Sequence, residues 1–490
     1  MPTALARRSS SCAIACLALS LACGEAQHSP PDAIDPIEPG TFLWARGAGG
    51  TDDDEASAAR PVSGGVLVAG SFRGEATFGR DEAAETTLLS AGSADAFLAR
   101  YDAEGRLIWA RADGGTSAER AASIAAEPDG GAWVTGSFGA EAVFGAGETQ
   151  ETTLQTTGSL DLFLARYDGD GALSWASGAG SFYGHDFGHG VAALPDGTLY
   201  VCGQFTDGAF FDQAGPNETR LTATLSGLFL ARYGADGEFI WAKAAGGDGE
   251  DSAQAVAAAP DGGAFVAGWF SAAAAFGEGG GLQALTSAGG TDLFLARYAP
   301  DGALAWARRA GGAGDDRAAW VELSPGGDLL VAGSFSGSAD FGDGAKTLVS
   351  SGGLDVFLAG YEHDGTLVWA ASGGGADDDV PYGGAAGDDG AILTGSFAGN
   401  ATFAGTLLQS TGGVSDLFVA SWDGAGSLRW ARSAGGSGVD AGLGAAGLAD
   451  GSALAVGRFG TRATFGAREA GETSLNSQGA ADVFLARYAP

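Results

Sequence analysis

The chain has 490 residues, of which 45% are hydrophobic, 87 are glycine and only 14 are proline. This composition is typical of folded protein with many turns, and it excludes both a collagen repeat and a proline-rich disordered chain. The formal net charge of −35 at pH 7 makes binding to nucleic acid, and electrostatic adhesion to anionic lipid, unfavourable.

The first segment, residues 1–22, has the order of a secretory signal. Two arginines precede an apolar stretch that ends at Ala22 and is too short to span a bilayer permanently. The run "LSLAC" resembles the lipobox of bacterial lipoproteins, although Ser20 and Leu21 depart from its usual order. The resemblance implies that Cys23 carries lipid and becomes the new N-terminus. Cys16, after "AIA", is the second candidate for lipidation. An ordinary cleaved signal is the alternative.

Residues 23–40 follow as a predicted disordered tether, because they contain four prolines and no apolar periodicity. Once the signal is removed and Cys23 is lipidated, only Cys202 remains, so no intramolecular disulfide is expected. These features predict an exported protein of the bacterial cell envelope or cell surface, attached to the membrane through its lipid anchor alone.

Residues 41–490 form one repetitive domain. The phrase "W-A" recurs seven times, and its tryptophans are spaced by 61 to 66 residues. The phrase "F-L" occupies a second position in each repeat, with "F-V" in its place at Phe418. The tryptophans are Trp44, Trp109, Trp175, Trp241, Trp306, Trp369 and Trp430. The phenylalanines are Phe97, Phe163, Phe229, Phe294, Phe357, Phe418 and Phe484, and we number repeats 1 to 7 in their order.

Each repeat is predicted to contain four short strands. In repeat 2 these are "RAASIAAEP", "GGAWVTGSF", "DLFLARY" and "GALSWA", with glycine-rich turns where a hairpin must reverse. Both faces of "DLFLARY" are largely apolar, so the sheet must be covered on both sides. Stacking neighbouring sheets achieves this, and a single four-stranded unit could not be stable alone.

The two ends of the domain carry complementary parts of one repeat. "TFLWARGAGG" at residues 41–50 is an isolated fourth strand, and the C-terminal "DVFLARYAP" is a third strand with no fourth after it. Pairing them would complete the last sheet and close a ring. The sequence therefore predicts an all-β fold: a seven-bladed β-propeller with four-stranded blades, in which the N-terminal strand closes the last blade. A β-helix solenoid is the alternative.

A family resemblance agrees with this architecture. The order G-S-F-x-G-x-A-x-F-G, then D-x-F-L-A-R-Y, then D-G-x-L-x-W-A resembles the SBBP β-propeller repeat of bacterial cell-envelope proteins, over essentially all of residues 41–490. Repeat 3 departs most, since "GQFTDGAFFD" and "SGLFLARY" lose a glycine and the aspartate. The resemblance implies an exported or surface-associated propeller and no established reaction.

One acidic residue begins the first strand of every repeat and predicts a ring of carboxylates at the mouth of the central channel. These residues are Asp54, Glu119, Asp186, Asp251, Asp316, Asp379 and Asp440. Such a ring could bind a cation, with Ca²⁺ the candidate outside the cell, or raise carboxyl pKa values. Alternatively, each carboxylate caps backbone N–H groups at its turn. No other cofactor is predicted, and the metal, if any, is unknown.

The irregular loop "SFYGHDFGHG" of repeat 3 supplies a second set of candidate binding residues. They are Phe182, Tyr183, His185, Asp186 and His189. A loop that differs from its equivalents is where a specific site is expected. The alternative is a surface loop that has drifted, and Cys202 is expected to be a buried apolar residue.

The spacing of histidine, serine and cysteine shows no catalytic set. We therefore expect a lipid-anchored, non-enzymatic binding or scaffold module, monomeric, with protein or glycan partners. The alternative is a polysaccharide hydrolase or lyase that uses two carboxylates at the channel mouth. A purely structural role is the third hypothesis.

Overall fold

The computed structural model describes residues 38–490 except 343, 345, 388 and 389, and residues 38–490 form one compact unit. The predicted signal (1–22), Cys23 and the tether up to residue 37 lie outside the described residues. The described part of the chain is all-β. Its only helical element is a 3-10 turn, η1 (Gly279–Gly281).

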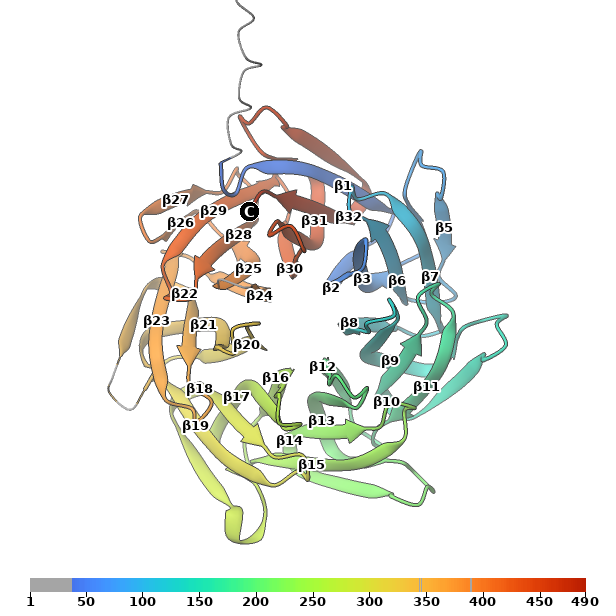
Figure 1. Cartoon of the computed structure of the whole chain (residues 1–490), viewed down its shortest axis with the longest axis vertical. Coiled ribbons are helices and arrows are strands. Elements are labelled where there is room, and N and C mark those ends of the chain that lie inside the picture. The colour runs from blue at the N-terminus through green and yellow to red at the C-terminus, as the bar shows by residue number, and fades with distance from the viewer. Residues whose placement is uncertain (1–37, 343, 345, 388–389) are drawn as a thin grey trace, which may run out of the picture. The chain divides into compact units, whose positions relative to one another are not determined.

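Each repeat folds into four antiparallel strands that run in order from the centre of the ring to its outside (Figure 1). The innermost strands are β2 (Glu55–Val62), β8 (Arg120–Ala126), β12 (Phe187–Ala193), β16 (Asp251–Ala258), β20 (Asp316–Leu323), β24 (Asp379–Gly387) and β30 (Ala441–Gly447). The second strands are β3 (Gly65–Phe72), β9 (Ala132–Phe144), β13 (Leu199–Phe211), β17 (Ala264–Phe276), β21 (Leu329–Asp340), β25 (Gly390–Phe397) and β31 (Ala453–Phe465).

The third and fourth strands complete each sheet. The third strands are β6 (Asp95–Asp102), β10 (Thr152–Tyr167), β14 (Thr219–Tyr233), β18 (Gln283–Tyr298), β22 (Thr347–Tyr361), β28 (Asp416–Asp423) and β32 (Thr473–Tyr488). The fourth strands are β7 (Leu107–Gly115), β11 (Leu173–Ala179), β15 (Phe239–Gly247), β19 (Leu304–Gly312), β23 (Leu367–Gly375), β29 (Leu428–Gly436) and β1 (Phe42–Gly50). This succession of antiparallel sheets around a centre is a β-propeller.

An outer hairpin joins the second strand to the third and links neighbouring repeats. In repeats 1 and 6 it forms separate strands, β4 (Glu75–Phe78) with β5 (Thr86–Leu89), and β26 (Asn400–Phe403) with β27 (Thr406–Gln409). Elsewhere it is an extension of the second and third strands. The paired glycines at the end of a fourth strand bond to the hairpin of the next repeat, as Gly246 and Gly247 do with Ala275 and Ala274.

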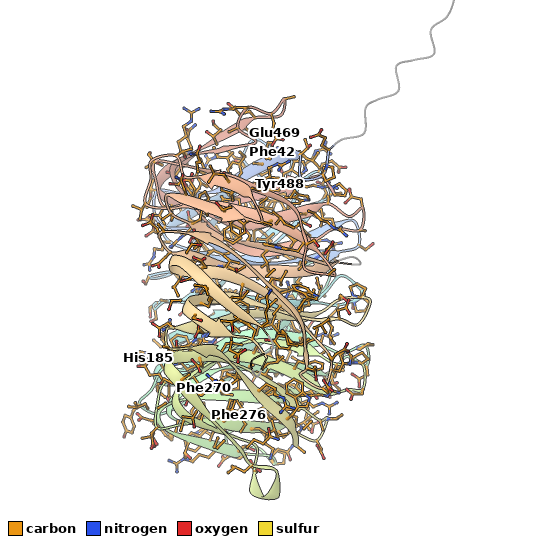
Figure 2. The ribbon with its side chains drawn as sticks, turned by 90° about the vertical axis from the view of Figure 1, so that its left-hand side faces the viewer. Phe42, His185, Phe270, Phe276, Glu469 and Tyr488 are labelled. Atoms are coloured by element: carbon orange, nitrogen blue, oxygen red, sulfur yellow. The ribbon has the colours of Figure 1, made fainter. Side chains whose placement is uncertain are left out.

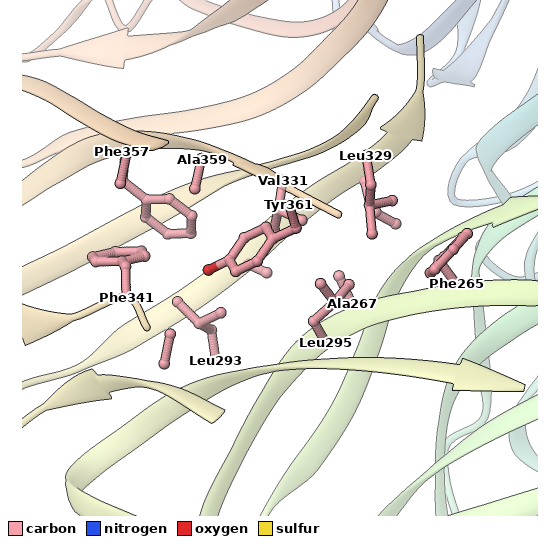
Figure 3. Close-up of a cluster of buried hydrophobic side chains, with 14 of the residues drawn as sticks. Phe265, Ala267, Leu293, Leu295, Leu329, Val331, Phe341, Phe357, Ala359 and Tyr361 are labelled. Atoms are coloured by element: carbon pink, nitrogen blue, oxygen red, sulfur yellow. The ribbon is translucent and has the colours of Figure 1, made fainter. Parts of the chain in front are cut away.

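The core lies between neighbouring sheets, as the two apolar faces of the strands predict. One cluster joins Phe265 and Leu295 of repeat 4 to Val331, Phe357 and Tyr361 of repeat 5, all buried (Figure 3). Each cluster needs side chains from two repeats, so the stacking of sheets supplies the hydrophobic stabilisation.

The same kind of junction is formed by the two ends of the described chain. Strand β1 pairs antiparallel with β32, with Phe42 opposite Tyr488 and Ala48 opposite Val483. Phe42 is buried, and its backbone N–H donates to the Glu469 carboxylate at 2.7 Å (Figure 2). The sequence predicted this pairing, and β1 also bonds to β4 of repeat 1, which links the last sheet to the first.

A turn glycine explains the recurring D-G-x-L-x-W-A phrase. The glycine between the third and fourth strands lies against the tryptophan of the preceding repeat, so that a Cβ on Gly237 would stand 2.7 Å from the Trp175 ring. Its φ of +84° is a left-handed conformation that favours glycine. Gly40, which precedes β1, takes this role for Trp430, with φ of +73° and a contact of 2.5 Å.

Candidate functional site

The predicted ring of carboxylates is present but buried. All seven side chains stand at the start of an innermost strand, and all are at most 1% exposed. Asp54 accepts the N–H of Gly50 at 2.8 Å and that of Arg73 at 3.0 Å. Glu119 makes the same two contacts, with Gly115 at 2.7 Å and Gly139 at 3.2 Å. These are the contacts of the turn-capping interpretation, and the groups do not line an open channel mouth.

A second carboxylate approaches the first in six repeats. It is the aspartate of D-x-F-L-A-R-Y, namely Asp95, Asp161, Asp292, Asp355, Asp416 and Asp482, each at most 4% exposed. One oxygen accepts a backbone N–H, as Asp95 does from Ala91 at 3.0 Å. In repeat 3 Gly227 stands at this position, and Asp251 therefore has no such neighbour.

Burial dominates the electrostatics of these pairs. It raises the pKa of Glu119 to about 7, and the charge of Asp95 adds to the rise while two backbone N–H groups oppose it. The pKa of Asp379 also rises to about 7, through burial and then the charge of Asp355. Each pair can therefore hold a proton close to neutral pH.

The described residues bring no three His, Cys, Asp or Glu side chains together in a group able to hold a metal ion. Calcium therefore stays a prediction from the acidic loops. Cys202 is fully buried, and burial raises its thiol pKa, so the thiolate needed for reactivity is suppressed.

The irregular loop of repeat 3 forms a stack of rings, not a cluster of converging ligands. His185 stacks on Phe187 with ring centroids 6.3 Å apart, and Phe187 stacks on His189 at 5.9 Å. The Nδ1 atom of His189 lies 2.9 Å from the Ala253 carbonyl, and burial lowers the pKa of this imidazole. Asp186 belongs to the turn-capping set, since it accepts the Ser181 N–H at 2.7 Å.

The two aromatic residues of this loop lie on the surface. Phe182 is 49% exposed and packs edge-on against Phe210, with centroids 5.2 Å apart. Tyr183 is 88% exposed. Sequence reasoning selected both residues but missed Phe210, which lies in the outer hairpin of repeat 3. Alignment of the repeats could have identified Phe210, because every other repeat has Thr, Val, Ala or Asp at this position.

Sequence reasoning also missed an axial cavity of ≈ 1090 Å³ at the other end of the innermost strands. Its walls come from the turns that follow β2, β8, β20, β24 and β30, whereas the buried carboxylates stand where these strands begin. Trp44, Trp422 and Trp430 line it. Prolines and aliphatic side chains supply most of the remaining wall, including Pro61, Pro325, Pro490, Val62, Ile392 and Leu448.

Three carboxylates line the cavity wall, and each is held by structural contacts. Asp102 accepts the backbone N–H groups of Glu104 at 3.0 Å and Arg106 at 2.8 Å. Asp450 forms an ion pair with Arg487 and accepts the Ser452 hydroxyl at 2.6 Å. Glu127 binds Arg166 at 2.9 Å and accepts the Trp133 indole N–H at 3.0 Å. Arg166 and Arg487 are the arginines of D-x-F-L-A-R-Y, and they hold inner turns to third strands.

Comparison with known proteins identifies no family. No family model matches the sequence, and no curated protein matches it. Solved structures that resemble the chain include YCF48 bound to D1 peptide, at 11% identity, covering 94% of this chain and 100% of that chain, with a TM-score of 0.36. Sqt1 from Chaetomium thermophilum has 12% identity and a TM-score of 0.29, and the match covers 76% of this chain and 96% of that chain.

A puromycin hydrolase mutant complexed with PGG has 15% identity and a TM-score of 0.35, covering 83% of this chain. The match spans 58% of that hydrolase's length. Among the described residues, no helix is long and apolar enough to cross a bilayer.

Proposed function

We propose that the protein is an exported, lipid-anchored propeller of seven blades that binds a protein or glycan partner in its axial cavity, without catalysing a reaction. The seven sequence repeats and the β1–β32 pairing support the blade count. The signal-like segment and Cys23 support the anchor, which would hold the propeller at the surface of the bacterial cell envelope. No metal or other cofactor is part of the proposal.

The axial cavity is the observation that carries the binding function. A concave site of ≈ 1090 Å³ has the size of a ligand pocket, and such sites combine apolar and aromatic walls with a few polar groups. Indole rings supply a large apolar surface with one polar N–H. Trp44 is half-buried at the wall, where a partner's side chain or sugar ring could pack on it.

The hydrolase alternative requires two carboxylates free to exchange protons with a substrate. Asp450 and Glu127 are instead engaged with Arg487 and Arg166. Asp102, the third carboxylate of the cavity wall, accepts two backbone N–H groups of its own turn. The carboxylates at the opposite end are buried against backbone N–H groups. The contacts of the acidic residues therefore favour binding over hydrolysis.

The test is capture from envelope extracts by the full-length chain. Ser63, in the exposed turn after β2, lines the cavity, so Ser63→Trp should obstruct it without disturbing the core. Ser174→Trp, on the exposed face of β11, is the matched control. We expect one set of proteins or glycans to be retained by the wild type and by the control and lost by Ser63→Trp. Identical profiles for all three would contradict the proposal.

Lipidation is tested separately by labelling cells with a radioactive fatty acid. The label should enter the wild-type chain and Cys16→Ser but not Cys23→Ser. Equal labelling of Cys23→Ser would place the anchor elsewhere.

A further inference from the structure

A second cavity, of ≈ 260 Å³, lies between repeats 2 and 3 on the outer part of the ring. Its polar wall comes from β10 and β11 of repeat 2 and from the outer hairpin of repeat 3. The side chains are Thr153, Gln155, Thr157, Asp161, Ser177 and Gln213. Phe138 and Phe210 provide aromatic surface in the same cavity.

At the position of Ser177 in the cavity wall, repeat 2 lacks a long side chain that most repeats have. At the position of Ser177, five other repeats carry Arg or Lys, two residues after the tryptophan, and repeat 5 carries Ala371. In repeat 3 this basic residue, Lys243, reaches Glu278 in the next outer hairpin at 3.1 Å. In repeat 6 the equivalent Arg432 lies 3.7 Å from Glu469. Ser177 leaves the corresponding space open.

Two further departures from the repeat meet at this cavity. Phe210 is the aromatic residue at a position where the other repeats have small or polar side chains, and it is half-buried in the wall. Phe182 packs on its edge, and Arg220 lies over its ring at 5.3 Å from the centroid. The loop that carries Phe182 is tied to the cavity wall, because the Thr157 hydroxyl donates to the Ser181 carbonyl at 3.0 Å.

Asp161, at the base of the cavity, belongs to the buried aspartates that recur through the repeats. It is 4% exposed, and its Oδ2 accepts the Thr157 N–H at 3.0 Å. Its Oδ1 is buried and makes no hydrogen bond. The equivalent oxygens of Asp95, Asp292, Asp355, Asp416 and Asp482 are unpartnered in the same way, so this oxygen belongs to the buried carboxylate pair of the repeat. The polar side chains that distinguish the cavity are Thr153, Gln155, Thr157, Ser177 and Gln213.

We propose that this cavity binds one residue of a neutral saccharide. Hydroxyl groups of a sugar match a wall of amide and hydroxyl side chains, which Gln155, Gln213, Thr153, Thr157 and Ser177 supply. The C–H face of the sugar ring can pack on the aromatic surface of Phe210. The volume is smaller than pockets that enclose drug-sized ligands, which suits a single ring of a longer chain. The net charge of −35 disfavours acidic sugars.

The experiment is titration calorimetry on the full-length chain with maltohexaose, cellohexaose and chitohexaose, and with hexagalacturonate as the acidic counterpart. At least one neutral oligosaccharide should bind, and hexagalacturonate should not. Ser177→Arg restores the residue type of five other repeats, so the fold should accept it, and its side chain should fill the cavity. We expect at least about a tenfold loss of affinity, whereas Ala371→Arg at the equivalent position of repeat 5 should bind like the wild type.

Gln213→Ala removes an exposed amide from the cavity wall, and it should also weaken binding while the melting temperature stays close to that of the wild type. Absence of binding by all three neutral oligosaccharides would overturn the proposal. So would equal affinity of Ser177→Arg and the wild type, which would place the sugar elsewhere. Ser63→Trp distinguishes the two sites, because obstruction of the axial cavity should leave this affinity unchanged.

Discussion

The junction that closes the ring and the junction between repeats 2 and 3 differ in an instructive way. The first joins segments more than 400 residues apart in sequence, yet it keeps the contacts of the repeat. Gly40 lies on Trp430, Asp482 neighbours Asp54, and β1 pairs along its length with β32. The second joins consecutive repeats, yet it has lost the bridging cation at Ser177 and gained Phe210 and Phe182.

The comparison separates what the fold needs from what a ligand could use. A ring fails if one junction fails, so the tryptophan–glycine contact and the buried carboxylates are kept even where the chain is discontinuous. Substitutions at the outer surface of a continuous junction cost little stability. The fold therefore tolerates departures at this junction, and a ligand site could use them.

The largest expected effect comes from the core of the closing junction. Phe42 is 3% exposed, and Phe239 of repeat 3 is its equivalent, two residues before the tryptophan and 7% exposed. Phe42→Ala and Phe239→Ala should each lower the free energy of unfolding by about 3–5 kcal/mol. Chemical denaturation measures both. A negligible loss for Phe42→Ala beside a full loss for Phe239→Ala would show that β1 is not part of the folded ring.

A smaller effect is expected at the turn glycines. Gly40→Ala and Gly237→Ala each force a left-handed φ on alanine, which costs about 1–2 kcal/mol, and each places a Cβ against an indole ring. The two variants should lose similar amounts of stability in the same denaturation assay. A large loss for Gly237→Ala alone would break the equivalence of the two junctions.

The buried carboxylate pairs predict a pH dependence that opposes ordinary acid denaturation. Burial raises the pKa of Asp379 to about 7 and that of Asp355 in the same direction, so the folded chain binds protons more tightly than the unfolded chain. This contribution to stability is complete below the unfolded pKa of about 4 and is lost as the pH rises through about 7.

Asp355→Asn removes the charge beside Asp379 and should reduce the fall in melting temperature between about pH 5 and about pH 8. Glu362→Gln, which alters an exposed carboxylate of the same repeat, should leave the profile unchanged. If the melting temperature of Asp355→Asn depends on pH as that of the wild type does, Asp355 and Asp379 do not interact.

The smallest effect is expected at the exposed loop of repeat 3. Tyr183 is 88% exposed, so Tyr183→Ser should change the free energy of unfolding by no more than about 0.5 kcal/mol. A loss near that of Phe239→Ala would place Tyr183 in a packed core and contradict the separation between fold and site.

The sequence predicted the fold because its signals repeat. Trp44 and Phe484 each have six equivalents, so strand order and the pairing of β1 with β32 follow from register alone. The cavities could not be predicted in this way. The axial cavity depends on how turns from several repeats converge. Ser177 can be recognised as a cavity residue only when its neighbours across the junction, Gln213 and Phe210, are known.

For the buried carboxylates, the sequence predicted the position of the side chains but not their orientation. Their shared position was evident from the spacing of Asp54 and its equivalents. Whether a side chain points into a channel or back onto Gly50 is decided by the backbone of the turn, which no residue type specifies. The second carboxylate of each pair, such as Asp482 beside Asp54, comes from a different strand.

A disulfide between β1 and β32 tests the closed ring most directly. Ala45 and Ala486 are directly opposite in the antiparallel pairing, where Cα atoms about 4.5–5.5 Å apart satisfy the geometry of a disulfide. In a Cys202→Ala background, the pair Ala45→Cys and Ala486→Cys should oxidise within one chain, and peptide mass spectrometry should find the two segments linked. Free thiols, or links formed only between chains, would contradict the closed ring.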